Sequence, residues 1–152
     1  MELLGHYTGR KFIYAYRKFL GLISISIYFN AFSHALRNNK EARVTSSPAT
    51  TEDWYTAAFS AMKSLYKYTP AKPGDRTLMD ALYPCLYALN ESKGDIQAAA
   101  EAAQRGAKST RGMKAKLGRT VYVGNVGDVP DPGAVGVAKL IEGMANVLRP
   151  GR

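Results

Sequence analysis

The chain has 152 residues, of which 46% are hydrophobic and 22% are charged. This composition is typical of a single globular domain and excludes a wholly disordered chain. The formal net charge of +9 favours a polyanionic partner, such as a nucleotide, nucleic acid or acidic lipid. Because Cys85 is the only cysteine, an intramolecular disulfide is excluded, and we expect a cytoplasmic protein from a reducing compartment.

An apolar run occupies Phe19–Phe29, inside a first helix that we predict from about Lys11 to Arg37. The run has eleven residues, whereas a membrane-spanning helix needs about 20. His34 and Arg37 interrupt the apolar character soon afterwards. We therefore predict a buried core helix and no membrane as partner.

Two further helices are predicted after the polar residues 38–50. The second begins near Thr50, because Thr50 and Asp53 have the spacing of a capping box. Trp54 and the apolar residues that follow it give that helix a buried face. The third is predicted to open at Asp75 and to be kinked by Pro84.

The fourth helix is predicted from about Asp95 to Gly112, with a face of small residues. The last begins with Asp131 as N-cap and Pro132 in the first helical position, and its buried side extends to Leu148. The sequence therefore predicts an all-α fold of antiparallel helices with short connections.

Two predicted helix starts could bind an anion. At Asp131–Gly133, free N–H groups meet the positive end of the helix dipole. At Gly74–Thr77, a glycine, a cation and a hydroxyl share one turn, and the cationic residues 114–119 lie between the two starts along the chain. Ordinary helix caps and a solvated charged face explain the same residues, and the residues alone favour this explanation. No Walker A loop, GxGxxG or HExxH motif is present.

Four segments resemble one family in their order. They are Lys72–Leu82 (KPGDRTLMDAL), residues 102–119 (AAQRGAKST and GMKAKLGR), Tyr122–Gly124 (YVG) and Pro130–Ala134 (PDPGA). Together they resemble the nucleotide-binding, DhaL-type domain of dihydroxyacetone (glycerone) kinases. The resemblance implies an antiparallel barrel of helices, eight in the complete domain, that binds ATP through magnesium.

The resemblance also implies which residues contact the nucleotide. They are Thr69, Thr77, Leu78, Arg119, Asp131, Pro132 and Gly133. The complete enzyme of this family transfers the γ-phosphoryl group of ATP to dihydroxyacetone, which a separate domain holds.

This sequence departs from the family at the magnesium site. The family places a cluster of aspartates near the start of the domain, but residues 1–50 contain no aspartate and only Glu2 and Glu41 as acidic residues. We therefore expect an incomplete domain of about five helices, truncated at its N-terminal side, with no metal ligands and no catalytic residue of its own. Residues 1–50 are predicted to form a divergent helix and loop, and residues 51–152 the C-terminal part of the domain.

Two functions follow as alternatives. The first is an impaired ATP-dependent dihydroxyacetone kinase domain that binds ATP or ADP. The second is a non-catalytic helical module that binds a nucleotide or another partner. A dihydroxyacetone-binding kinase domain or the missing N-terminal segment is the expected partner. We also expect self-association or marginal stability, because an incomplete barrel exposes apolar surface. The net charge alone supports nucleic acid, which we do not predict as a partner.

Overall fold

The computed structural model describes residues 24–39, 48–117 and 128–148, and every regular element in these ranges is an α-helix. After a first helix at residues 24–39, the helices are α2 (Thr51–Leu65), α3 (Met79–Glu91), α4 (Ile96–Ser109) and α5 (Pro132–Val147). The predicted all-α bundle of about five helices is therefore confirmed. Within the described residues, no helix is long and apolar enough to cross a membrane.

The start of α2 has the predicted capping box. The carboxylate of Asp53 accepts the Thr50 backbone N–H at 2.6 Å, and the Thr50 hydroxyl in turn accepts the Asp53 N–H at 3.4 Å. This reciprocal pair satisfies N–H groups that the first turn of a helix leaves without partners.

The third helix begins at Met79, so the predicted start at Asp75 is wrong. Gly74 and Arg76 have φ angles of +91° and +60°, in the left-handed region. Residues of a right-handed helix cannot have these angles, and the chain therefore turns before α3 begins.

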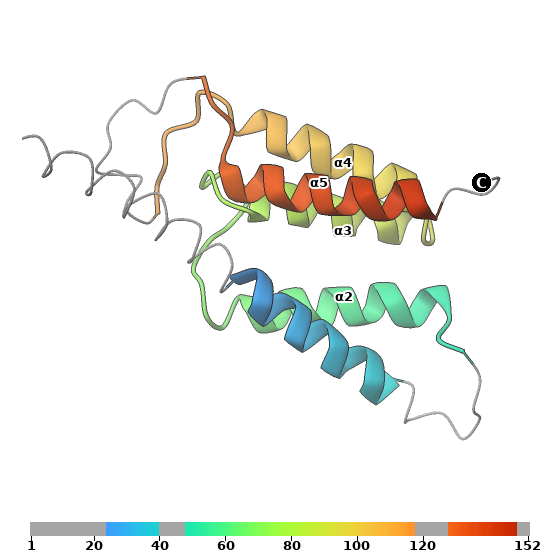
Figure 1. Ribbon diagram of the computed structural model, residues 1–152. Helices are drawn as coiled ribbons and strands as arrows, with labels where there is room; N and C mark the ends of the chain where they lie inside the picture. Colours follow the sequence, from blue (N-terminus) through green and yellow to red (C-terminus); the bar gives the residue numbers. More distant parts are fainter. Residues whose placement is uncertain (1–23, 40–47, 118–127, 149–152) are drawn as a thin grey trace, which may run out of the picture.

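Helices α3, α4 and α5 pack side by side, with α4 antiparallel to both neighbours (Figure 1). The buried face of α4 consists of alanines, which lets its neighbours approach closely. At Gly106 the approach leaves no room for a side chain, because a β-carbon there would overlap the carbonyl oxygen of Asp80 in α3.

Helix α5 begins as the sequence predicts, with Asp131 as N-cap and Pro132 in the first turn. The Asp131 carboxylate accepts the Ala134 N–H at 2.9 Å. The predicted burial of Leu148 is wrong, since α5 ends at Val147 and the Leu148 side chain is 61% exposed.

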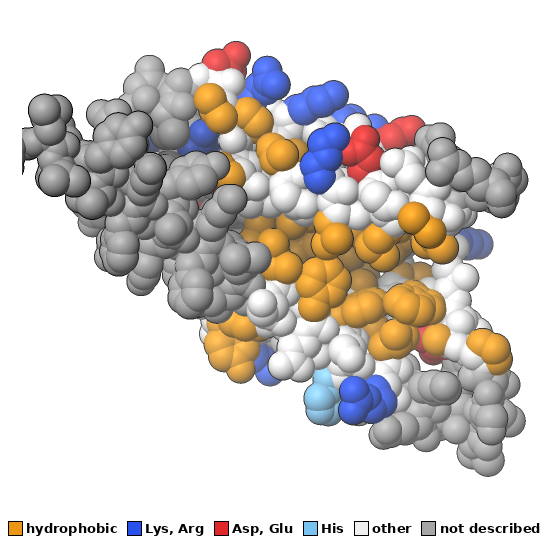
Figure 2. Space-filling model, viewed as in Figure 1, with side chains coloured by type: hydrophobic (Ala, Val, Ile, Leu, Met, Phe, Trp, Pro, Cys, Tyr) orange, Lys and Arg blue, Asp and Glu red, His pale blue; other side chains and the backbone are white. Residues whose placement is uncertain are grey.

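One hydrophobic core joins all these helices, from Tyr28 in the first helix to Ala138 in α5. Trp54, predicted on the buried face of α2, is instead 46% exposed and rests its ring against Phe32, with 5.7 Å between ring centroids. Figure 2 shows hydrophobic side chains in a band between α5 and the first helix. The bundle thus leaves apolar surface uncovered on this face.

Candidate nucleotide site

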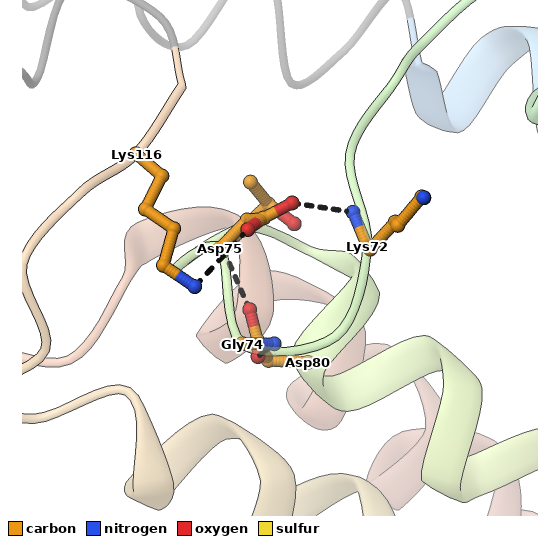
Figure 3. A network of polar contacts seen from close by, with 6 residues as sticks. Lys72, Gly74, Asp75, Asp80 and Lys116 are labelled. Atoms are coloured by element: carbon orange, nitrogen blue, oxygen red, sulfur yellow. Dashed lines mark hydrogen bonds and ion pairs between the residues drawn. The ribbon is translucent and has the colours of Figure 1, made fainter.

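The turn before α3 is held by two carboxylates (Figure 3). Asp75 accepts the Lys72 N–H at 2.9 Å and forms an ion pair of 3.5 Å with Lys116, which lies in the loop after α4. Asp80, in the first turn of α3, accepts the N–H groups of Gly74 at 2.6 Å and Thr77 at 2.7 Å. The turn is therefore fixed both to its own helix and to the loop after α4.

Arg76 connects this turn to the segment that leads into α5. The side chain is buried, with 4% of its surface exposed. Its Nε donates to the carbonyl of Thr110 at 3.3 Å, and its Nη2 donates to the carbonyl of Val129 at 2.6 Å. Two segments that follow the turn by 34 and 53 residues are thereby tied to it.

Thr110 extends the same connection to the N-cap of α5. It is fully buried, and its hydroxyl accepts the Asp131 N–H at 2.7 Å while donating to the Ala107 carbonyl at 2.6 Å. A buried hydroxyl that both donates and accepts carries no unsatisfied polar atom. The end of α4 and the start of α5 are therefore joined through one side chain.

The Asp131 carboxyl has a pKa above its ordinary value because it is largely buried. The N–H groups of Ala134 and Gly133 and the Arg76 guanidinium act in the opposite direction, since each favours the carboxylate. Burial has the larger effect on the pKa of Asp131. Asp131 is therefore an N-cap whose carboxylate is partly shielded from water.

Leu78 and Gly133 lie against each other. A β-carbon built on Gly133 would be 3.4 Å from Leu78 Cβ, 3.5 Å from Leu78 N and 3.0 Å from Asp131 Oδ2. Three of the residues singled out in the sequence thus meet at the start of α5. Thr77 immediately precedes Leu78, and its hydroxyl accepts the Met79 N–H at 3.2 Å. Pro132 is exposed in the first turn of α5.

Thr69 lies in a different environment. It lines an open groove of about 750 Å³ together with Tyr66, Pro70, Lys72, Pro73 and Tyr83. The Thr69 hydroxyl accepts the Ala71 N–H at 3.2 Å. Arg119, the remaining predicted contact, lies outside the described residues.

The sequence predicted Arg76 as the cation of a possible anion-binding turn, but its guanidinium is buried and donates to two main-chain carbonyls instead. Asp80 and Thr110 were not predicted as part of the site. Arg76 and Asp80 belong to the PGDRT-x-x-DAL segment, which was an available signal. Thr110 offered a weaker one, as a single hydroxyl at the end of an alanine-rich helix. Only in the folded chain does Asp80 hold the turn that contains Arg76, while Arg76 and Thr110 connect this turn to the start of α5.

The carboxylates of this region do not form a magnesium site. No group of three or more His, Cys, Asp or Glu side chains that could hold a metal occurs in residues 24–39, 48–117 and 128–148. Asp75, Asp80 and Asp131 each accept hydrogen bonds from backbone N–H groups instead. Their oxygens stabilise turns and a helix start, and the residues present do not fit the metal.

Comparison with known proteins identifies relatives of this chain. The chain is 43% identical over 127 residues to dihydroxyacetone kinase 2 of Saccharomyces cerevisiae and 40% identical over 128 residues to the dihydroxyacetone kinase of Pichia angusta. These matches cover 78% and 79% of this chain but only 20% and 21% of the relatives. The chain therefore spans about one fifth of their length. A triokinase/FMN cyclase of Rattus norvegicus is 33% identical over 104 residues, which are 63% of this chain and 18% of that protein.

Solved structures give the same result. The native crystal structure of the dihydroxyacetone kinase of C. freundii matches with a TM-score of 0.58 and 29% identity, over 82% of this chain and 20% of that one. The complex of that enzyme with AMP-PNP and Mg²⁺ matches with a TM-score of 0.53 and 27% identity, over 82% of this chain and 19% of that one.

The family model of the DAK2 domain matches residues 20–146, which is most of the chain. This chain is thus a member of the DAK2 domain family of dihydroxyacetone kinases.

Proposed function

We propose that this chain is the nucleotide-binding part of an ATP-dependent dihydroxyacetone kinase domain. The contact between Leu78 and Gly133 beside the Asp131 N-cap is the observation that supports this proposal best. It brings two motifs that are far apart in the sequence to a single helix start. The proposed nucleotide contacts are Thr69, Thr77, Leu78, Arg119, Asp131, Pro132 and Gly133.

The chemistry of these residues suits a nucleotide. The helix dipole places partial positive charge at the first turn of α5, which favours an anionic ligand. The free N–H groups expected there are instead engaged by the Asp131 carboxylate, which accepts the N–H groups of Gly133 and Ala134. Gly133 has no side chain to hold a ligand away from the backbone. The Leu78 side chain offers an apolar surface to a base, and the Arg119 guanidinium is suited to bidentate binding of phosphate.

We further propose that the chain by itself transfers phosphate to dihydroxyacetone poorly. Phosphoryl transfer depends on positioning and on cations that neutralise the charge on the transferred group. Asp75, Asp80 and Asp131 accept backbone N–H groups, and no group of three or more acidic, His or Cys side chains among the described residues could hold a metal. Efficient transfer therefore requires carboxylates from another polypeptide or segment.

A second candidate function is a non-catalytic module that binds nucleotide and a protein partner. The hydrogen bonds between the carboxylates and backbone N–H groups favour this second function. A site without metal ligands can still bind a nucleotide, although it cannot transfer phosphate efficiently. A dihydroxyacetone-binding kinase domain is the proposed partner, since the match covers only 21% and 20% of the relatives, which therefore extend far beyond it.

The test is titration calorimetry of ATP and ADP with and without magnesium, on the wild-type chain and two glycine variants. Gly133→Ala places a methyl group against Leu78, whereas Gly136→Ala, one turn later in α5, meets nothing within 4 Å. We expect magnesium-independent binding that Gly133→Ala weakens and Gly136→Ala leaves unchanged. Equal affinity in the two variants would refute the nucleotide site.

A coupled assay of dihydroxyacetone phosphorylation separates the two candidate functions. The kinase reading predicts slow turnover by the chain alone and faster turnover when a dihydroxyacetone-binding kinase domain is added. The module reading predicts nucleotide binding without turnover in both cases. Fast, magnesium-dependent turnover by the chain alone contradicts the proposed impairment.

A further inference from the structure

Arg76 has three unusual properties in one residue. Its φ of +60° is rare for a residue with a side chain, its charged group is buried, and its Nη1 has no hydrogen-bond partner within residues 24–39, 48–117 and 128–148. A left-handed conformation in a non-glycine residue costs free energy, and so does a buried donor without an acceptor. Such costs persist where the surrounding structure requires the residue in that place.

The guanidinium of Arg76 connects two segments of the chain, which explains why an arginine is needed at this position. It reaches the Thr110 carbonyl at the end of α4 and the Val129 carbonyl two residues before the Asp131 N-cap. Thr110 in turn receives the Asp131 N–H. Arg76 is thus bound to the start of α5 by two routes, one direct and one through Thr110.

Thr77 and Leu78 directly follow Arg76 in the turn. We expect a displacement of Arg76 to move Leu78 relative to Gly133, because a β-carbon built on Gly133 would lie only 3.4 Å from Leu78 Cβ. The guanidinium also stabilises the charged form of the Asp131 carboxyl, against the larger effect of burial. Both sides of the proposed nucleotide site thus depend on one side chain.

We propose that Arg76 is the positioning residue of the nucleotide site and fixes the separation between the Thr77–Leu78 turn and the start of α5. It does this without contacting the nucleotide, because its side chain is buried between the two segments. This inference rests on the proposed function. An arginine is required because its planar fork donates to two carbonyls at once, whereas the single ammonium group of lysine cannot hold the same geometry.

The first measurement is ATP affinity of the full chain at a temperature at which each variant is folded by circular dichroism. Arg76→Met removes both hydrogen bonds, Arg76→Lys keeps the charge, and Arg105→Met changes an exposed arginine of α4 that pairs with Glu101. We expect Arg76→Met to bind ATP about tenfold or more weakly than wild type, because it loses both hydrogen bonds of a charged group that holds the turn in place. The ATP affinity of Arg76→Lys should lie between those of Arg76→Met and wild type. The ATP affinity of Arg105→Met should equal that of wild type.

The second measurement is amide hydrogen exchange without nucleotide. A positioning role predicts faster exchange at Thr77, Asp131 and Ala134 in Arg76→Met, with unchanged exchange at Ala103 in the middle of α4. A merely structural role predicts equal acceleration at all four amides. If Arg76→Met does not fold, Arg76→Lys provides the same comparison.

The outcomes separate this inference from the proposed function. If the wild-type chain binds ATP, equal affinity in the folded Arg76→Met variant overturns the inference. If the wild-type chain does not bind ATP, the proposed function fails, and exchange alone decides whether Arg76 fixes the turn against α5. Uniform acceleration, or no acceleration, at the four amides overturns the inference in either case.

Discussion

Gly106 in α4 lies directly against the carbonyl group of Asp80 in α3. The absence of a side chain at Gly106 sets how closely these two helices approach. The same Asp80 supplies the carboxylate that holds the turn before α3. The packing of two helices and the geometry of the candidate site therefore meet at one residue pair.

Substitution of Gly106 by alanine should destabilise the protein. The new methyl group would overlap the Asp80 carbonyl and come within 2.9 Å of Pro84 Cγ, so the helices must separate. We expect the free energy of unfolding to fall by about 1–3 kcal/mol in urea denaturation. Gly136→Ala is the control, because it should stabilise α5 by about 0.5–1 kcal/mol. Equal effects of the two substitutions would contradict the close packing.

Substitution of Asp80 by asparagine should be far more harmful than the same change at Asp95. Both carboxylates accept two N–H groups, but Asp80 uses both oxygens, and an asparagine would present an NH₂ group to one donor. We expect a loss of about 1.5–3 kcal/mol in thermal or urea unfolding for Asp80→Asn. Asp95→Asn should stay close to wild type, since asparagine is an equally good N-cap and Asp95 uses one oxygen. Asp80→Asn should also weaken ATP binding.

Alkaline pH should destabilise the protein through Cys85 and Tyr28. Burial raises the pKa of the Cys85 thiol from 9.0 to about 12, and the pKa of Tyr28 is raised mainly by burial as well. Because the unfolded chain releases these protons at lower pH, the free energy of unfolding should fall as the pH rises above about 9. Each group contributes a slope of up to about 1.4 kcal/mol per pH unit.

The measurement is urea denaturation of wild type and Cys85→Ala between pH 8 and pH 11. The variant should have the shallower slope, whatever the cost of its smaller side chain at pH 8. Parallel slopes would show that Cys85 ionises equally in the folded and unfolded states. Thiol labelling at pH 8 should in addition be slow until the protein unfolds.

The chain should self-associate through the exposed apolar side of α5. Leu140 and Met144 lie one turn apart and are 42% and 41% exposed. We expect the double variant Leu140→Glu, Met144→Glu to shift sedimentation velocity profiles toward the monomer. Asn146→Glu adds charge at another exposed position of α5 and should leave the profile unchanged. A wild-type chain that is monomeric at high concentration would disprove this prediction.

Sequence patterns predicted the elements whose signals are local. The capping box of Thr50 and Asp53 and the N-cap at Asp131 each depend on residues within four positions, and both were predicted correctly. The start of α3 was predicted wrongly because Asp75 resembles an N-cap. The true turn depends on the left-handed Arg76 and on the Asp80 carboxylate.

The network around Arg76 could not be derived from spacing alone. The partners of Arg76 are the main-chain carbonyls of Thr110 and Val129. Every residue has such a carbonyl, so the sequence cannot indicate which residues supply the acceptors. Family resemblance directed attention to Thr77, Leu78 and the Asp131–Gly133 turn, but it gave no reason for their proximity. These segments are close because of a tertiary contact, in which the buried side chain of Arg76 connects them.

The carbonyl partners of Arg76 also limit which amino-acid substitutions this region can accept during evolution. A mutation that weakens an ion pair can be compensated by a change in the partner side chain. A main-chain carbonyl has no side chain to exchange, so no replacement at Thr110 or Val129 can supply a better acceptor for a shorter residue at position 76. We therefore expect genetic suppressors of Arg76 substitutions to be reversions at that position. In a deep mutational scan, position 76 should be intolerant and should show no pairwise rescue.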